Sequence, residues 1–311
     1  MDKMMNNALN NEGKILKMVD AETGEITNEF NTATHYLRSK KQDDFLQKVS
    51  EAKEEFEAFN SEAGKFIWSY PEKIQYLITS DEFSKSDLTM VFYLATYVNG
   101  MGYLTHDNNN IKLDKADLQK VLGVGRNLFN KLHAKLLQHE ILIPSGINYK
   151  WNEAFNFYGA TKGKAKPTML VRTYVMQIRE LYEAKNEAGK RKYSATLLYP
   201  IIALVPYLHR TSNIICKNPD VKDINDIEYF SLTEIAELLD LKNSKKMSSS
   251  LSGILLDGQT TFRKVESKNE KYLQMNPRIF WRDVVAPDSR LVAEFNMIDN
   301  NRKNKRKNKK F

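Results

Sequence analysis

Hydrophobic and polar positions follow the same pattern twice along this chain of 311 residues. The segment from Leu113 to Val124 aligns without a gap with the segment from Phe230 to Leu241. Each opens with a residue suited to cap a helix, Asp114 or Ser231, and continues with apolar residues at helical spacing before a short break. The pattern predicts one helix followed by a turn at two places in the chain.

A second helix is predicted after each break, from Arg126 to Glu140 and from Asn243 to Leu256. One apolar stripe on each helix would pack inward and leave the other face polar. Those polar faces carry amides, hydroxyls and cations, which hydrogen-bond to base edges and phosphates. The candidates for DNA contact are Arg126, Asn127, Asn130, Lys131 and Lys135 in the first copy, and Asn243, Ser244, Lys245, Lys246, Ser248, Ser249 and Ser252 in the second.

An apolar strand, a turn and another strand follow each second helix, over residues 141–151 and 260–275. A hairpin in that place is typical of the wing of a winged-helix domain. Upstream, the segment from Ser86 to Leu94 aligns with the segment from Ser194 to Ile202 as the first helix of each domain. Four cations of the second hairpin are expected to hold the DNA backbone or minor groove: Arg263, Lys264, Lys268 and Lys271.

The expected fold class is α+β, mainly helical with small β-hairpins, built from two tandem winged-helix domains. An acidic helix before them is expected to pack on the first domain or to serve self-association. A connecting helix is predicted from Val171 to Ala184. The expected parts are a flexible N-terminus with the acidic helix over 1–64, the first domain over 65–160, a linker with the connecting helix over 161–190, the second domain over 191–285, and a basic tail over 286–311.

Positive charge is concentrated at the C-terminal end, since seven of the cations behind the net charge of +8 lie between residues 302 and 310. Such a segment cannot bury a core, and it would act as a disordered arm that seeks phosphates without reading sequence. A solubilising terminus and attraction to anionic lipid are the alternatives. The cations assigned to DNA in this arm are Arg302, Lys303, Lys305, Arg306 and Lys307.

The sequence offers no constellation for an enzyme, so neither catalytic residues nor a metal or cofactor are expected. It holds no phosphate-binding glycine loop of the ATPase type and no cluster of Cys and His for zinc, and its five histidines are scattered. The single cysteine, Cys216, suits a reducing cytoplasm. No apolar run is long enough to cross a membrane, and no membrane partner is expected.

The segment from Met275 to Arg282 resembles the wing exit of replication proteins from Firmicute plasmids and phages, and the helix from Leu232 to Leu241 and the tandem layout are similar to the same group. The resemblance covers residues 66–285, with a departure where Glu153 stands in place of Pro277. It implies an initiator that binds double-stranded DNA at origin repeats and recruits the host helicase, helicase loader or polymerase. The residues alone also allow a homodimer, a transcriptional repressor on an operator, or a helicase-loading adaptor.

Overall fold

The computed structural model describes residues 15–19, 26–31, 40–106, 111–161, 166, 169–267 and 270–295, and the chain divides into two compact units, 1–54 and 55–311. In the first unit, strand β1 (Ile15–Val19) pairs antiparallel with β2 (Ile26–Asn31). Helix α2 (Lys40–Ala63) begins in this unit and ends in the next. Phe45, Leu46 and Val49 are exposed on its first half.

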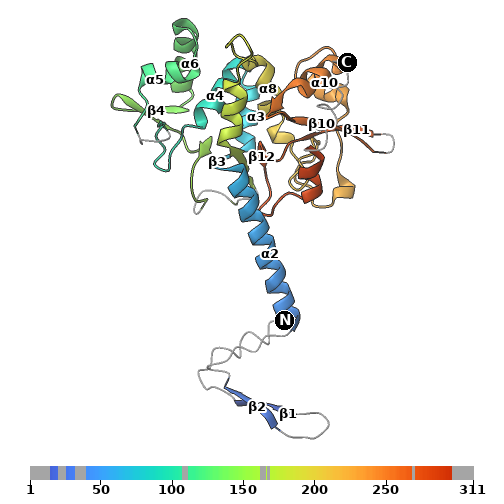
Figure 1. Ribbon diagram of the computed structural model, residues 1–311. Coiled ribbons are helices and arrows are strands. Elements are labelled where there is room, and N and C mark those ends of the chain that lie inside the picture. Colours follow the sequence, from blue (N-terminus) through green and yellow to red (C-terminus); the bar gives the residue numbers. More distant parts are fainter. Residues whose placement is uncertain are drawn as a thin grey trace. The chain divides into compact units, whose positions relative to one another are not determined.

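The second unit contains two halves whose main elements follow in a corresponding order, and the second half adds η3, η4, β8 and β9 (Figure 1). The first half comprises β3 (Phe66–Ser69), α3 (Pro71–Thr79), α4 (Lys85–Ala95), α5 (Lys115–Leu122), α6 (Arg126–Gln138), β4 (Leu142–Ser145), β5 (Asn148–Trp151) and β6 (Asn156–Phe157). The second half comprises β7 (Val171–Tyr174), α7 (Val175–Glu183), α8 (Ala195–Ala203), η3 (Val205–Tyr207), η4 (Ile224–Asp226), α9 (Leu232–Leu238), α10 (Ser244–Gly253), β8 (Leu255–Leu256), β9 (Gln259–Thr260), β10 (Phe262–Ser267), β11 (Glu270–Met275) and β12 (Phe280–Trp281). A last helix covers residues 289–295.

Helices alternate with small antiparallel sheets, which confirms the α+β class. The predicted helix pairs are confirmed as α5 with α6 and α9 with α10, and the predicted hairpins as β4 with β5 and β10 with β11. The segments aligned as first helices form α4 and α8, which α3 and α7 precede. Their alignment was shifted by two residues, because Ser84 and not Ser86 caps α4 in the place where Ser194 caps α8. The connecting helix begins only at Val175, since residues 171–174 form strand β7.

A four-stranded sheet in the order β12-β7-β3-β6 joins the halves. Its two central strands, β3 and β7, are the entry strands of the two halves, and they pair antiparallel with Phe66 opposite Tyr174 and Ser69 opposite Val171. Each exit strand, β6 or β12, pairs with the entry strand of its own half. Exchanging the halves leaves this pattern unchanged, so the sheet has an approximate two-fold axis between β3 and β7.

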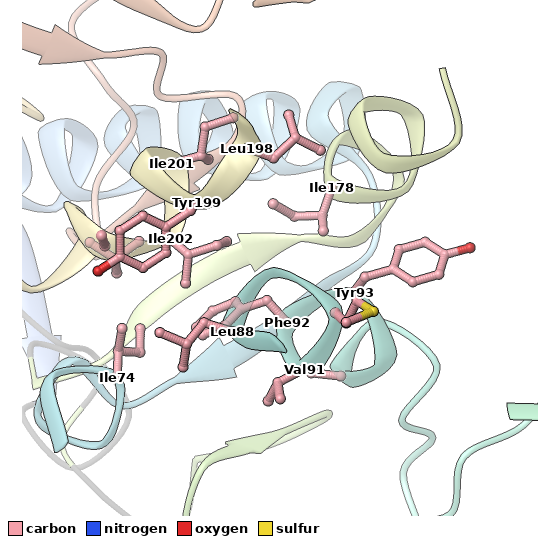
Figure 2. Close-up of a cluster of buried hydrophobic side chains, with 14 of the residues drawn as sticks. Ile74, Leu88, Val91, Phe92, Tyr93, Ile178, Leu198, Tyr199, Ile201 and Ile202 are labelled. Carbon is pink, nitrogen blue, oxygen red and sulfur yellow. The ribbon is translucent and has the colours of Figure 1, made fainter. Parts of the chain in front are cut away.

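The halves also share one hydrophobic core. Leu88 and Phe92 of α4 point toward Tyr199 and Ile202 of α8, in the close-up of Figure 2. Each fully buried side chain of this size contributes about 1.5–3 kcal/mol to folding. The Thr89 hydroxyl donates to the Ala195 carbonyl oxygen across the same contact, at 2.8 Å. The halves are therefore one folding unit.

Helix α7 packs on both halves, although the sequence placed it between two domains. Its Arg179 donates to the backbone oxygen of Thr96 in the first half, at 2.8 Å, while the Glu180 carboxylate accepts from the amide of Asp257 in the second half, at 2.6 Å. The Tyr182 ring stacks on Tyr93 of α4, with centroids 3.9 Å apart. These contacts hold the two halves at a set separation.

The end of α2 packs on the shared sheet. Phe56 and Phe59 join a cluster with Tyr174, Trp281 and Phe295, which come from β7, β12 and the helix over 289–295. The acidic helix was expected to pack on the first domain, whereas these partners come mainly from the second half. Trp281 and Phe295 are distant from α2 in the sequence. They lie next to it because the four-stranded sheet places β12, near the end of the chain, two strands from β3, which directly follows α2.

Candidate nucleic-acid interface

The helix pair of the first half is positioned by its caps and its turn. Asp114 and Asp117 form a capping box at the start of α5, in which each side chain accepts from the other's backbone amide. Gly123 ends α5 with φ +58°, a conformation that favours glycine. Helix α6 then starts at Arg126, directly after the turn.

Helix α6 turns one side to the core and the other outward. Phe129, Leu132 and Leu136 are buried. The side chains that the sequence assigned to DNA contact are exposed at four positions: Arg126, Asn127, Asn130 and Lys131. The exposed face therefore offers two cations and two amides close to the N-terminal end of a helix, where the helix dipole also favours an anion.

Lys135 does not belong to this exposed set. Its ammonium group donates to the carboxylate of Asp87 at 2.7 Å, and the Asp87 side chain is 6 % exposed. The sequence assigned Lys135 to DNA because it continues the polar face of α6. In the structure its charge is paired with a buried carboxylate of α4, so Lys135 has a structural role, and its assignment to DNA stays a prediction.

The helix pair of the second half is built in the same way. Ser231 and Glu234 form the capping box of α9, and Lys217 donates to the Glu234 carboxylate at 2.6 Å. This hydrogen bond is the main reason why the pKa of Glu234 falls to about 2. Asn243 caps α10 by accepting from the amide of Lys246, at 2.9 Å. Asn243 is thus a structural cap as well as an exposed amide.

Each turn between the paired helices is held by a cation from the other half. Lys85 donates to the Leu239 carbonyl oxygen at 2.8 Å, and Arg191 donates to the Leu122 carbonyl oxygen at 2.5 Å. Carbonyl groups at the end of a helix lack partners within the helix and carry partial negative charge. The orientation of each helix pair therefore depends on the opposite half.

A groove of about 350 Å³ lies between α10, the start of α9 and strand β10. Its walls are Leu232, Ser244, Lys245, Ser248, Ser249, Ser252 and Lys264. Six of these seven side chains were assigned to DNA from the sequence, and the structure brings them together. Leu232 is half-buried and lines the groove. Lys246 is exposed on the same helix.

The cations of the second hairpin differ in their exposure and in their acidic partners. Arg263 is paired with Glu294 and donates to Gln274, with 15 % of its side chain exposed. Lys264 and Lys271 both approach the carboxylate of Glu266, at 2.9 and 3.7 Å. Arg263 therefore has a structural role in the hairpin, and its assignment to DNA stays a prediction. Lys268 and the tail cations Arg302, Lys303, Lys305, Arg306 and Lys307 lie outside the described residues.

In the described part of the chain, no three His, Cys, Asp or Glu side chains gather as a metal site would require. Burial raises the pKa of the Cys216 thiol to about 11. Over the same residues, every helix is too short or too polar to span a lipid bilayer. The chain matches no protein-family model, no curated protein and no solved structure.

Proposed function

We propose that this protein binds duplex DNA in a sequence-specific manner through two tandem winged-helix modules, with α6 and α10 entering the major groove. The observation that supports this most is the doubled unit of two helices and a hairpin, in which α6 exposes cations and amides, and α10 with its cap Asn243 exposes cations, hydroxyls and an amide. Such side chains recognise base edges and phosphates. The groove beside α10 adds Lys264 of the hairpin to the same surface.

The site on DNA would have two half-sites. The two-fold register of the central sheet turns the halves in opposite directions, so the half-sites are expected to be inverted with respect to each other. Because α7 fixes the separation of the halves, the distance between the half-sites is expected to be fixed as well. Insertion of about 5 base pairs, half a helical turn, between them should abolish the gain from the second half-site.

Within this class we propose a replication initiator of a plasmid or phage. The support is the resemblance of the segment from Met275 to Arg282 to the wing exit of such proteins. The segment after the hairpin forms the same turn in both halves. The side-chain oxygen of Asn152 accepts from the backbone amide of Ala154, and that of Asn276 accepts from the backbone amide of Arg278. The sequence carries no ATPase glycine loop, so opening of an origin would draw on bending of DNA by binding energy.

Sequencing of the fragments that the protein retains from the genome of its source tests the proposal. An initiator should retain an origin with repeats, and the retained repeats should contain inverted half-sites. Retention of promoter operators alone would instead support a repressor. Strong binding to a replicative helicase with little affinity for any duplex would contradict the DNA-binding proposal and favour a helicase-loading adaptor.

A further inference from the structure

The hairpin of the second half has two faces, and both are covered. Phe262, Leu273 and Met275 face the shared core, while Val265 and Tyr272 lie on the opposite face. That opposite face is covered by residues 217–229, which we call the covering segment. Its Ile227 packs in the same cluster, and its Tyr229 ring stacks on Tyr272 with centroids 4.4 Å apart.

The first half has the equivalent hairpin without this cover. The bridge between Tyr103 and Lys150 corresponds to the bridge between Ile214 and Gln274 in the second half. The bridge between Thr105 and Lys112 corresponds in the same way to that between Cys216 and Tyr229. Tyr103 therefore takes the place of buried Ile214, and Lys112 takes the place of Tyr229 at the end of the covering segment.

The connection between the bridged positions is shorter in the first half, where it spans residues 106–111 instead of 217–228. In sequence, its residues 107–110 are an aspartate and three asparagines, so they bring no apolar side chain. Ile111, which follows them, is 55 % exposed. Among the described residues, none packs on this face of the first hairpin as Ile227 and Tyr229 pack on the second.

We call the uncovered surface the open hairpin face. Its strand residues are Ile143, Ser145 and Lys150, with Tyr103 and Lys112 beside them and Ile147 in the adjoining turn. The ammonium groups of Lys112 and Lys150 lie 3.7 and 5.0 Å from the centroid of the Tyr103 ring. Ile143 is 43 % exposed and Ile147 is 81 % exposed. Neither lysine has a carboxylate partner in the described part of the chain.

We propose that the open hairpin face binds an extended acidic segment of a partner protein that carries aliphatic or aromatic side chains between its carboxylates. The covering segment has this chemistry, because its acids Asp220, Asp223, Asp226 and Glu228 alternate with Val221, Ile224, Ile227 and Tyr229. The open face has the matching chemistry, with two lysines around an aromatic ring and isoleucines beside them. The second half thus shows that the apolar residues of such a segment fit this face of the hairpin, and the two lysines of the open face add groups that would pair with its carboxylates.

A protein segment fits the face better than DNA does. A phosphate backbone would pair with the two lysines but would leave Ile143 and Ile147 without apolar contacts. The face also points away from α6, since Tyr149, on the other side of β5, contacts His133 of α6 with ring centroids 5.2 Å apart. The partner can therefore bind while α6 is free, and this inference does not depend on the proposed DNA-binding function.

A synthetic, fluorescein-labelled peptide with the sequence of residues 218–230 serves as the probe, titrated with the full chain and followed by fluorescence anisotropy. We expect saturable binding that K112E/K150E weakens at least tenfold and that a scrambled peptide lacks. K185E/K190E is the matched control, because it changes the net charge equally at two exposed lysines elsewhere. It should leave peptide binding within twofold of the wild type. Thermal unfolding would verify that both variants fold.

Four outcomes would overturn the inference. The first is absence of saturable peptide binding, and the second is an equal loss in K112E/K150E and in the control. The third is a loss of duplex DNA binding in K112E/K150E with peptide binding intact, which would make the face a nucleic-acid surface. A concentration-dependent molar mass that only K112E/K150E abolishes, without peptide binding, would assign the face to a second copy of the chain and would equally reject the acidic partner.

Discussion

Lys135 of α6 donates a hydrogen bond to the buried carboxylate of Asp87 in α4, at 2.7 Å. The same carboxylate accepts from the backbone amide of Ser84 in the capping box of α4. One carboxylate therefore links the proposed reader helix, α6, to α4. A cation on the polar face of a helix can therefore stabilise the fold, and such a position does not by itself indicate contact with DNA.

The first prediction separates these two roles. Lys135→Met leaves the Asp87 carboxylate buried without its partner, and we expect it to lower the free energy of unfolding by about 1–3 kcal/mol, less than for a fully buried pair because Lys135 is partly exposed. Lys131→Met, at an exposed position of the same helix, should change stability by less than about 0.5 kcal/mol and weaken DNA binding. Urea denaturation and gel-shift titration measure the two effects. Equal stability of the two variants would refute the structural role of Lys135.

The second prediction concerns the groove beside α10. Lys245→Ala with Lys246→Ala should weaken binding to the cognate site by well over tenfold, at about 1–3 kcal/mol for each good contact. Lys185→Ala with Lys190→Ala removes the same charge outside both helix pairs and should have a much smaller effect. A gel-shift titration in which both double variants bind like the wild type would exclude α10 as a reader.

The third prediction concerns the basic segment at the C-terminal end of the sequence. Removal of residues 302–311 takes away seven cations and should lower affinity for all DNA sequences alike. The slope of log affinity against log salt concentration should also become shallower, by up to about 6 if all seven cations contact phosphates. Filter binding at several salt concentrations measures both. A loss confined to the cognate site would contradict the role of a sequence-blind arm.

The fourth prediction concerns acid. Because the pKa of Glu234 is about 2 in the folded chain and 4.5 without these interactions, its carboxylate stabilises the fold fully above pH 4.5 and loses this effect as the pH falls toward 2. Glu234→Gln should therefore be less stable than the wild type at neutral pH, and the difference should shrink below pH 4.5. Glu237→Gln, on the same helix, is the control. A difference that stays constant down to pH 2, measured by urea denaturation, would show that the Lys217 hydrogen bond does not set this pKa.

Helices and hairpins that depend on residues close to one another in the sequence could be predicted. The caps Asp114 and Ser231, and the apolar positions that follow them at helical spacing, place α5 and α9 because both signals act within a few turns of one helix. The hairpins follow from short apolar runs around a turn. The doubling of the unit was visible for the same reason.

Elements that depend on distant partners could not be predicted. Strands β6 and β12 have two residues each, and only pairing with β3 and β7 makes them strands. The run from Val171 to Tyr174 is buried on both sides, so it lacks the alternation that marks a strand and was interpreted as helix. The same limit applied to the candidate site. Lys135 and Arg263 differ from their exposed neighbours only through Asp87 and Glu294, acids that the chain brings from other elements.

The antiparallel pairing of β3 with β7 gives the chain the architecture of a symmetric dimer joined by a peptide link. One half expressed alone would expose the edge of β3 or β7 that normally pairs with the other half. Its free backbone hydrogen-bonding groups could then be paired by association with a second copy. Fusion removes the dependence on protein concentration that governs an ordinary dimer. In a fused chain the two halves can also change independently of each other. The first half can therefore keep an exposed hairpin face, whereas residues 217–229 cover the corresponding face in the second half.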